Sequence, residues 1–215
     1  MPREPVIKYV RRMGRPVFTT RELAALAGKS LSSTSQGLGY LARQGLLIKV
    51  RRGLWADPAD ERLSVFAAVP FLVPGQRAYI SFISALHLHG LIEQIPRVTT
   101  LASTAHSRIV RTSLGDYRIH RIAPSFFAGF DWYRGGKSFL IASQEKALVD
   151  TLYLSVHRKR QYRHFPELHL PGSFSCRKAR DWARRIPSAR ARTAVSRELE
   201  RLLSSCLLPR PYPSR

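Results

Sequence analysis

Apolar side chains recur at helical spacing in two short stretches near the start of the sequence. The first covers residues 6–10 and the second covers residues 21–27. Thr19 or Thr20 can cap the second stretch at its N-terminus. Gly28 suits its C-terminus, because glycine adopts the left-handed conformation at little steric cost. The pattern therefore predicts two short helices.

A third helix is expected after the tight connection at residues 28–30, beginning at Ser32 as its N-cap and ending near Gln44. Its predicted apolar stripe consists of Ser35, Leu38, Leu41 and Ala42. Small or hydrogen-bonding residues occupy the predicted outward face, which consists of Ser33, Gln36, Gly37, Tyr40 and Arg43. Such a face suits a DNA groove, where side chains reach base edges. Two helices joined by a short turn form a helix-turn-helix arrangement.

A short hairpin with a basic tip is predicted directly after this third helix. Residues 45–50 are typical of a strand, residues 51–53 of a turn that contains two arginines, and residues 54–56 of a returning strand. A helix-turn-helix followed by such a hairpin is a winged helix. We therefore assign residues 1–56 to a winged helix-turn-helix DNA-binding domain.

The rest of the sequence predicts a mixed α/β domain over residues 62–205, after a linker at 57–60, and a disordered tail over residues 206–215. Helices are expected over 63–73 and 78–91, the latter beginning near Ser81 or Ser84, and after the cap Ser143 over 144–154. Strands are expected over 98–102, 107–112, 117–122 and 138–142, and two C-terminal helices bury stripes within 179–186 and 191–203. The fold class is therefore α+β, with a small, mainly antiparallel sheet and C-terminal helices.

Positive charge is concentrated at the two ends of the chain. The 215 residues include 36 Lys and Arg against 14 Asp and Glu, a formal charge of +22. Residues 1–56 hold 11 basic and 2 acidic residues (+9), residues 57–156 hold 10 and 8 (+2), and residues 157–215 hold 15 and 4 (+11). Such a field attracts polyanions, so a nucleic acid or an anionic membrane surface is expected as the partner rather than a cationic substrate.

Membrane insertion, export and metal binding are not expected. The most apolar stretches are broken by proline, glycine and arginine before they reach the ~20 residues of a membrane span, and no signal peptide follows the N-terminal charges. The two cysteines, Cys176 and Cys206, form no metal-binding pair. We expect a cytoplasmic protein with no cofactor, no bound metal and no membrane partner.

The DNA contacts are predicted to come from the third helix, its preceding turn and the hairpin. Ser33, Gln36 and Tyr40 are the candidates for base or sugar contacts, and Ser32 lies beside them. The candidates for phosphate contacts are Lys29, Arg43, Lys49, Arg51 and Arg52. Arg190, Arg197 and Arg201 share one face of the last helix as a possible further basic surface, either for DNA or for an acidic protein.

Three segments together resemble the AbiEi family of antitoxins. They are the head that ends in GLLIKVRRGLW (45–55), the segment AYISFISALHLHGL (78–91) and the segment ASQEKALVD (142–150). The resemblance covers about residues 5–204. It implies a type IV toxin–antitoxin system, linked to phage defence, in which the antitoxin represses its own promoter at inverted repeats, as a monomer or a dimer. It also implies a nucleotidyltransferase-like toxin, which the second domain antagonises.

Two other functions are compatible with the sequence. A ligand-responsive winged-helix regulator without a toxin partner would use the middle domain as a metabolite pocket. A metal-dependent DNA nuclease would use Asp131, Glu145 and Lys146. That set requires the glutamate and the lysine to alternate on a strand, whereas Glu145 and Lys146 are adjacent on a predicted helix, so we expect no enzymatic activity and no catalytic residues.

Overall fold

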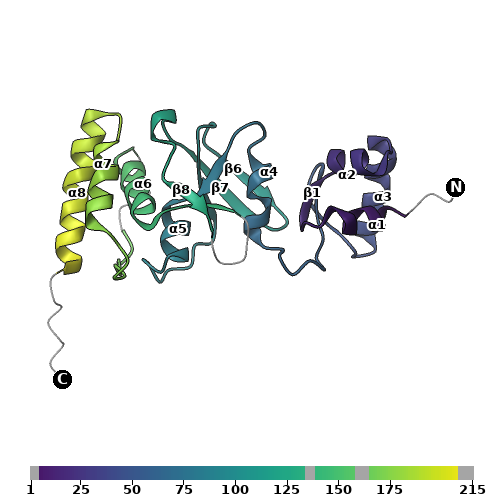
Figure 1. Cartoon of the computed structure of the whole chain (residues 1–215), viewed down its shortest axis with the longest axis horizontal. Coiled ribbons are helices and arrows are strands. Elements are labelled where there is room, and N and C mark those ends of the chain that lie inside the picture. The colour runs from purple at the N-terminus through teal and green to yellow at the C-terminus, as the bar shows by residue number, and fades with distance from the viewer. Residues whose placement is uncertain (1–4, 134–138, 158–164, 208–215) are drawn as a thin grey trace, which may run out of the picture. The chain divides into compact units, whose positions relative to one another are not determined.

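The computed structural model describes residues 5–133, 139–157 and 165–207 (Figure 1). The chain forms two compact units. Unit 1 comprises Met1–Gly75, Val110–Asp116 and Tyr133–Phe139, and unit 2 comprises Gln76–Ile109, Tyr117–Trp132 and Leu140–Arg215.

Unit 1 begins with three helices and a small sheet in the predicted order. Its elements are α1 (Val6–Met13), β1 (Val17–Thr19), α2 (Thr20–Ala27), α3 (Leu31–Arg43), β2 (Ile48–Arg51) and β3 (Leu54–Ala56), followed by the 3₁₀ helix η1 (Val65–Ala68) and the short helix α4 (Val69–Leu72). Strand β1 was not predicted, and it pairs antiparallel with β3 to give the strand order β1-β3-β2. The helix-turn-helix and the hairpin are confirmed.

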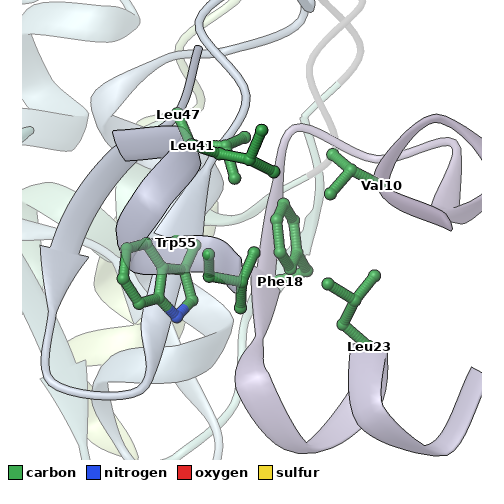
Figure 2. Close-up of a cluster of buried hydrophobic side chains, with 7 residues drawn as sticks. Val10, Phe18, Leu23, Leu41, Leu47 and Trp55 are labelled. Atoms are coloured by element: carbon green, nitrogen blue, oxygen red, sulfur yellow. The ribbon is translucent and has the colours of Figure 1, made fainter. Parts of the chain in front are cut away.

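Both faces of this small sheet are buried. Alternate residues of each strand point to opposite sides of the sheet, and each side packs against a cluster of apolar residues. Phe18 of β1 lies opposite Trp55 of β3, and both side chains face the helices. Figure 2 shows this cluster, which consists of Val10, Phe18, Leu23, Leu38, Leu41, Leu47 and Trp55. On the other face Val17, Val50, Leu54 and Ala56 are covered by Leu63, Ala67, Phe71 and Leu114. The second cluster explains why all three residues of β3 are buried.

The larger sheet has six strands in the order β6-β7-β5-β4-β9-β8. Its strands are β4 (Ala78–Ile80), β5 (Thr99–Ser103), β6 (Arg108–Thr112), β7 (Gly115–Arg121), β8 (Phe130–Trp132) and β9 (Leu140–Ala142). The pairs β4–β5 and β8–β9 are antiparallel, whereas β5–β7 and β4–β9 are parallel, so the sheet is mixed. The α+β fold class is confirmed.

Unit 2 also contains helices. They are α5 (Phe82–Leu88), the 3₁₀ helix η2 (Pro124–Phe126), α6 (Gln144–His157), α7 (Cys176–Arg184) and α8 (Ala189–Leu207). Helix α6 packs against α5, α7 and α8, and the last three helices lie side by side in Figure 1. The Ser143 hydroxyl accepts a hydrogen bond from the Lys146 amide, as expected for the predicted cap.

Three predicted segments differ from the structure or lie partly outside the described residues. The helix expected within 78–91 begins at Phe82 with Ser81 as its N-cap, one of the two predicted starting points, whereas Ala78–Ile80 form strand β4, which was not predicted. Residue 138 of the predicted strand 138–142 and residues 208–215 of the predicted tail lie outside the described residues, and residues 206–207 complete α8.

Candidate nucleic-acid interface

The helix-turn-helix begins with a capping box at the start of α2. The Thr19 amide donates to Glu22 Oε2 (2.7 Å) and the Glu22 amide donates to Thr19 Oγ1 (3.2 Å). Arg15 adds an ion pair with Glu22 at 2.8 Å. Partial burial acts to raise the pKa of Glu22, but the hydrogen bonds from Thr19 and the charge of Arg15 outweigh it and lower that pKa. Arg15 thus neutralises Glu22, the one acidic side chain among the described residues 5–56.

The connection between α2 and α3 is three residues long. Gly28 ends α2 with φ at 60°, and the next amide, that of Lys29, donates to the Ala24 carbonyl at 3.1 Å. The N-cap of α3 is Ser30, whose Oγ accepts from the Ser33 amide at 3.2 Å. The prediction of Ser32 as the cap is therefore wrong, because the helix begins one residue after Ser30. Ser32 instead lies exposed in the first turn.

The buried face of α3 differs from the predicted stripe at one position. Thr34, Leu38 and Leu41 are buried, whereas Ser35 is exposed. The Thr34 hydroxyl is accommodated because it donates to the Ser30 carbonyl at 2.9 Å.

One residue of the predicted outward face packs against α1 instead. A Cβ at Gly37 would lie 2.8 Å from Val6 Cγ2, so Gly37 permits the close contact between α1 and α3. Gly39 was not included in the predicted outward face. A Cβ added at Gly39 would contact only the Arg43 side chain. Apart from Gly37, the predicted contact residues of α3 are exposed: Ser32, Ser33, Gln36, Tyr40 and Arg43.

The hairpin supplies three cations that the structure places at its edge and tip. Lys49 is exposed with its Nζ 5.9 Å from the centroid of the Trp55 ring, Arg51 is half-buried and Arg52 is exposed at the turn. The Trp55 indole N–H donates to the Thr20 hydroxyl at 2.8 Å. The Thr20 amide donates to the Gly53 carbonyl at 3.0 Å. These two bonds hold the hairpin against the start of α2.

Helix α1 adds basic residues that the sequence interpretation did not assign to the site. The Arg12 guanidinium and the Lys29 ammonium each lie 5.5 Å from the centroid of the Tyr9 ring. Tyr9 therefore brings the end of α1 beside the turn of the helix-turn-helix. Lys8 and Arg11 on the same helix are exposed. The close spacing of these basic residues along the sequence is the signal that could have added α1 to the predicted site.

Residues 23–56 contain no Asp or Glu but five Lys and Arg residues. This segment covers most of α2, all of α3 and the whole hairpin. Anions therefore meet no carboxylate from this stretch, and phosphate groups can be bound by its cations while exposed hydroxyl and amide groups on α3 reach base edges.

The three predicted arginines of α8 belong to unit 2, and they are not equivalent. Arg201 donates to Glu198 Oε1 at 2.5 Å, and this hydrogen bond lowers the pKa of Glu198. Arg190 and Arg197 are exposed and line a groove between α6 and α8 that Ser155 and Thr193 also line. Arg201 is thus paired with Glu198, whereas Arg190 and Arg197 line the groove.

The residues considered for a nuclease site have other contacts. Asp131 is exposed on β8, and its Oδ1 accepts from the Trp132 amide at 2.7 Å. Glu145 is buried and accepts from the Ser175 amide at 3.1 Å. Lys146 is fully buried in an ion pair with Asp150. Within the described ranges, no three His, Cys, Asp or Glu side chains are grouped so as to hold a metal ion.

Comparison with known proteins found a family model that matches the N-terminal segment. Residues 6–56 match the family model described as transcriptional regulator, AbiEi antitoxin. No curated protein sequence matches the chain. In the described part of the chain, no helix has the length and apolar character needed to cross a membrane. The match confirms the resemblance for the winged helix, over residues 6–56, and supports a role as a transcriptional regulator or antitoxin.

Proposed function

We propose that the protein is a DNA-binding transcriptional repressor and the antitoxin of a type IV toxin–antitoxin operon, which represses its own promoter at inverted repeats. The observation that carries the proposal is the surface formed by α3 and the hairpin. It combines exposed serine, glutamine and tyrosine side chains with cations, and residues 23–56 supply no carboxylate to repel DNA. The family match over residues 6–56 supports the same role.

In this proposal α3 enters the major groove and the hairpin follows the backbone. Gln36 can form two hydrogen bonds with adenine, and Gly39 allows α3 to approach the DNA closely. The proposed base or sugar contacts come from Ser32, Ser33, Gln36 and Tyr40. The proposed phosphate contacts come from Lys29, Arg43, Lys49, Arg51 and Arg52.

A matched pair of glutamine variants tests the role of α3 in sequence recognition. Gln36 and Gln44 are both exposed, but Gln36 lies in the middle of the proposed recognition face, whereas Gln44 is the C-cap of α3. Gln36→Ala is expected to lower the preference for promoter DNA over random duplex by about 1–3 kcal/mol, the value of one bidentate base contact. Gln44→Ala is expected to leave it unchanged. Equal effects of the two substitutions in a mobility-shift assay would exclude α3 as the reading helix.

The antitoxin part of the proposal concerns a nucleotidyltransferase-like toxin encoded beside this gene. We expect the full-length chain, expressed from an unrelated promoter, to relieve growth arrest by that toxin. Because neutralisation is assigned to the second domain, Gln36→Ala is expected to protect the cells as well as the unmodified chain does. If the full-length chain gives no protection, the antitoxin role is excluded and the repressor role is tested separately by the binding assay.

A further inference from the structure

The outer edge of the hairpin is held by a residue distant in sequence. Strand β2 is an edge strand, and its register with β3 shifts between Lys49 and Arg51, which leaves Val50 at a bulge. At this bulge the Ser113 hydroxyl donates to the Lys49 carbonyl at 3.1 Å, and the Ser113 amide donates to the Val50 carbonyl at 3.3 Å. Ser113 thus satisfies two consecutive carbonyls next to the basic tip.

The turn that carries Ser113 is ordered by its own contacts. The Thr112 hydroxyl donates to the Gly115 carbonyl at 2.9 Å and accepts from the Leu114 amide at 3.1 Å. The Leu114 side chain packs on the face of the small sheet that carries Val17, Val50, Leu54 and Ala56. Residues 112–115, named here the wing clamp, therefore hold both the edge and one face of the hairpin, and all of these contacts lie within unit 1.

We infer that Ser113 and Leu114 are positioning residues for DNA binding, acting through the hairpin without touching DNA. This inference rests on the proposed function. A bulged edge strand with free carbonyls frays, and its cations then sample many arrangements. The wing clamp fixes β2, so Lys49, Arg51 and Arg52 keep one spacing in which all three bind successive phosphates at once, and without it fewer of them bind at a time.

Two variants of the wing clamp and two matched controls test the inference in the full-length chain. Ser113→Ala removes the hydroxyl bond at the bulge, and Leu114→Ala removes the apolar cover. Ser107→Ala removes a hydroxyl that accepts from the Arg121 amide, and Ile109→Ala shortens an exposed side chain on β6. Both control residues belong to unit 2, whereas the hairpin belongs to unit 1.

The first readout is amide hydrogen exchange without DNA. Ser113→Ala and Leu114→Ala are expected to accelerate exchange over residues 48–54 more than over α2 and α3. The two controls are expected to exchange like the unmodified chain. A uniform increase over residues 5–56, or no increase over 48–54, would overturn the inference.

The second readout is the salt dependence of affinity for random duplex DNA. Each phosphate contact contributes about 0.9 to the slope of log affinity against log salt, so loss of up to three hairpin cations is expected to reduce the slope by up to about 2.7. An unchanged slope in Leu114→Ala would overturn the inference even if promoter recognition persists. Lack of promoter preference in the unmodified chain would instead overturn the proposed function. In that case hydrogen exchange and the salt slope of affinity for random DNA still decide the role of the wing clamp.

Discussion

Alanine substitutions at Gly37 and Gly39, two positions in the middle of α3, are expected to differ in stability because only one meets a neighbouring helix. Replacing glycine by alanine inside a helix stabilises it by about 1 kcal/mol, and this gain applies to both sites. At Gly37 the new Cβ lies 2.8 Å from Val6 Cγ2, and such overpacking costs about 1–3 kcal/mol. Gly39→Ala meets only the flexible end of Arg43 at 3.8 Å. Gly37→Ala is therefore expected to be less stable than Gly39→Ala by about 1–3 kcal/mol.

Urea denaturation of both full-length variants measures this difference, and hydrogen exchange over residues 5–56 locates it in unit 1. A double variant provides the control, because Val6→Ala removes the methyl group that the new Cβ meets. In the Val6→Ala background the two alanine variants are expected to have the same free energy of unfolding. Equal stability in the presence of Val6, or a difference that persists without it, would refute the assignment of Gly37 to helix packing and Gly39 to the exposed face.

Three further predictions concern buried charge, pH and salt. Lys146→Met strands the buried Asp150 carboxylate and is expected to cost about 3–5 kcal/mol in urea denaturation, whereas Lys178→Met, at an exposed site, changes stability by no more than about 0.5 kcal/mol. The pKa of Glu22 is lower in the folded chain than in the unfolded chain, so its stabilising contribution is present above the unfolded pKa and is lost as the pH falls through the folded pKa. When unfolding is followed from pH 7 downward, Glu22→Gln is therefore expected to lose less free energy of unfolding than the unmodified chain. Arg52→Ala is expected to reduce the salt slope of DNA affinity by about 0.9 on promoter and random duplex alike, and a loss confined to promoter DNA would contradict a phosphate contact.

Local capping residues made α2 predictable. The start of α3 depended on which of several serines caps the helix, and the sequence leaves this open. Thr19 is followed three residues later by Glu22, the pattern of a capping box, and the structure forms that box. Ser30, Ser32 and Ser33 can each cap a helix by type. The short turn after Gly28 selects Ser30, so the burial pattern favours Thr34 over Ser35.

Strands β1 and β4 and the long-range contacts were the features that the sequence could not indicate. Strands β1 and β4 are too short to show an alternating pattern, and their pairing with distant strands defines them. Lys146 and Asp150 stand four residues apart, which is the spacing of an ordinary exposed ion pair on a helix. Their burial is compensated by residues distant in sequence. Tyr79 of β4 and Ser81, which follows β4, donate hydrogen bonds to the Asp150 carboxylate at 3.0 and 2.7 Å.

The buried Lys146 also illustrates how unit 2 tolerates a charge in its interior. Burial lowers the pKa of Lys146, and the Asp150 carboxylate opposes this effect by its charge and hydrogen bond. The ammonium further lies 3.7 Å from the centroid of the Phe126 ring and 5.5 Å from that of Trp182. A carboxylate and two aromatic rings, from three separate parts of the chain, thus replace the water that this lysine loses.

The most direct test of the central claim is the ratio of affinities for the promoter DNA of the protein's own operon and for a random duplex of equal length, measured at one fixed salt concentration. If α3 reads sequence and the hairpin binds phosphates, the promoter is expected to bind at least about 10³-fold more tightly than the random duplex. Equal affinities for the two duplexes would contradict a sequence-specific repressor and leave only a general attraction between a basic protein and DNA.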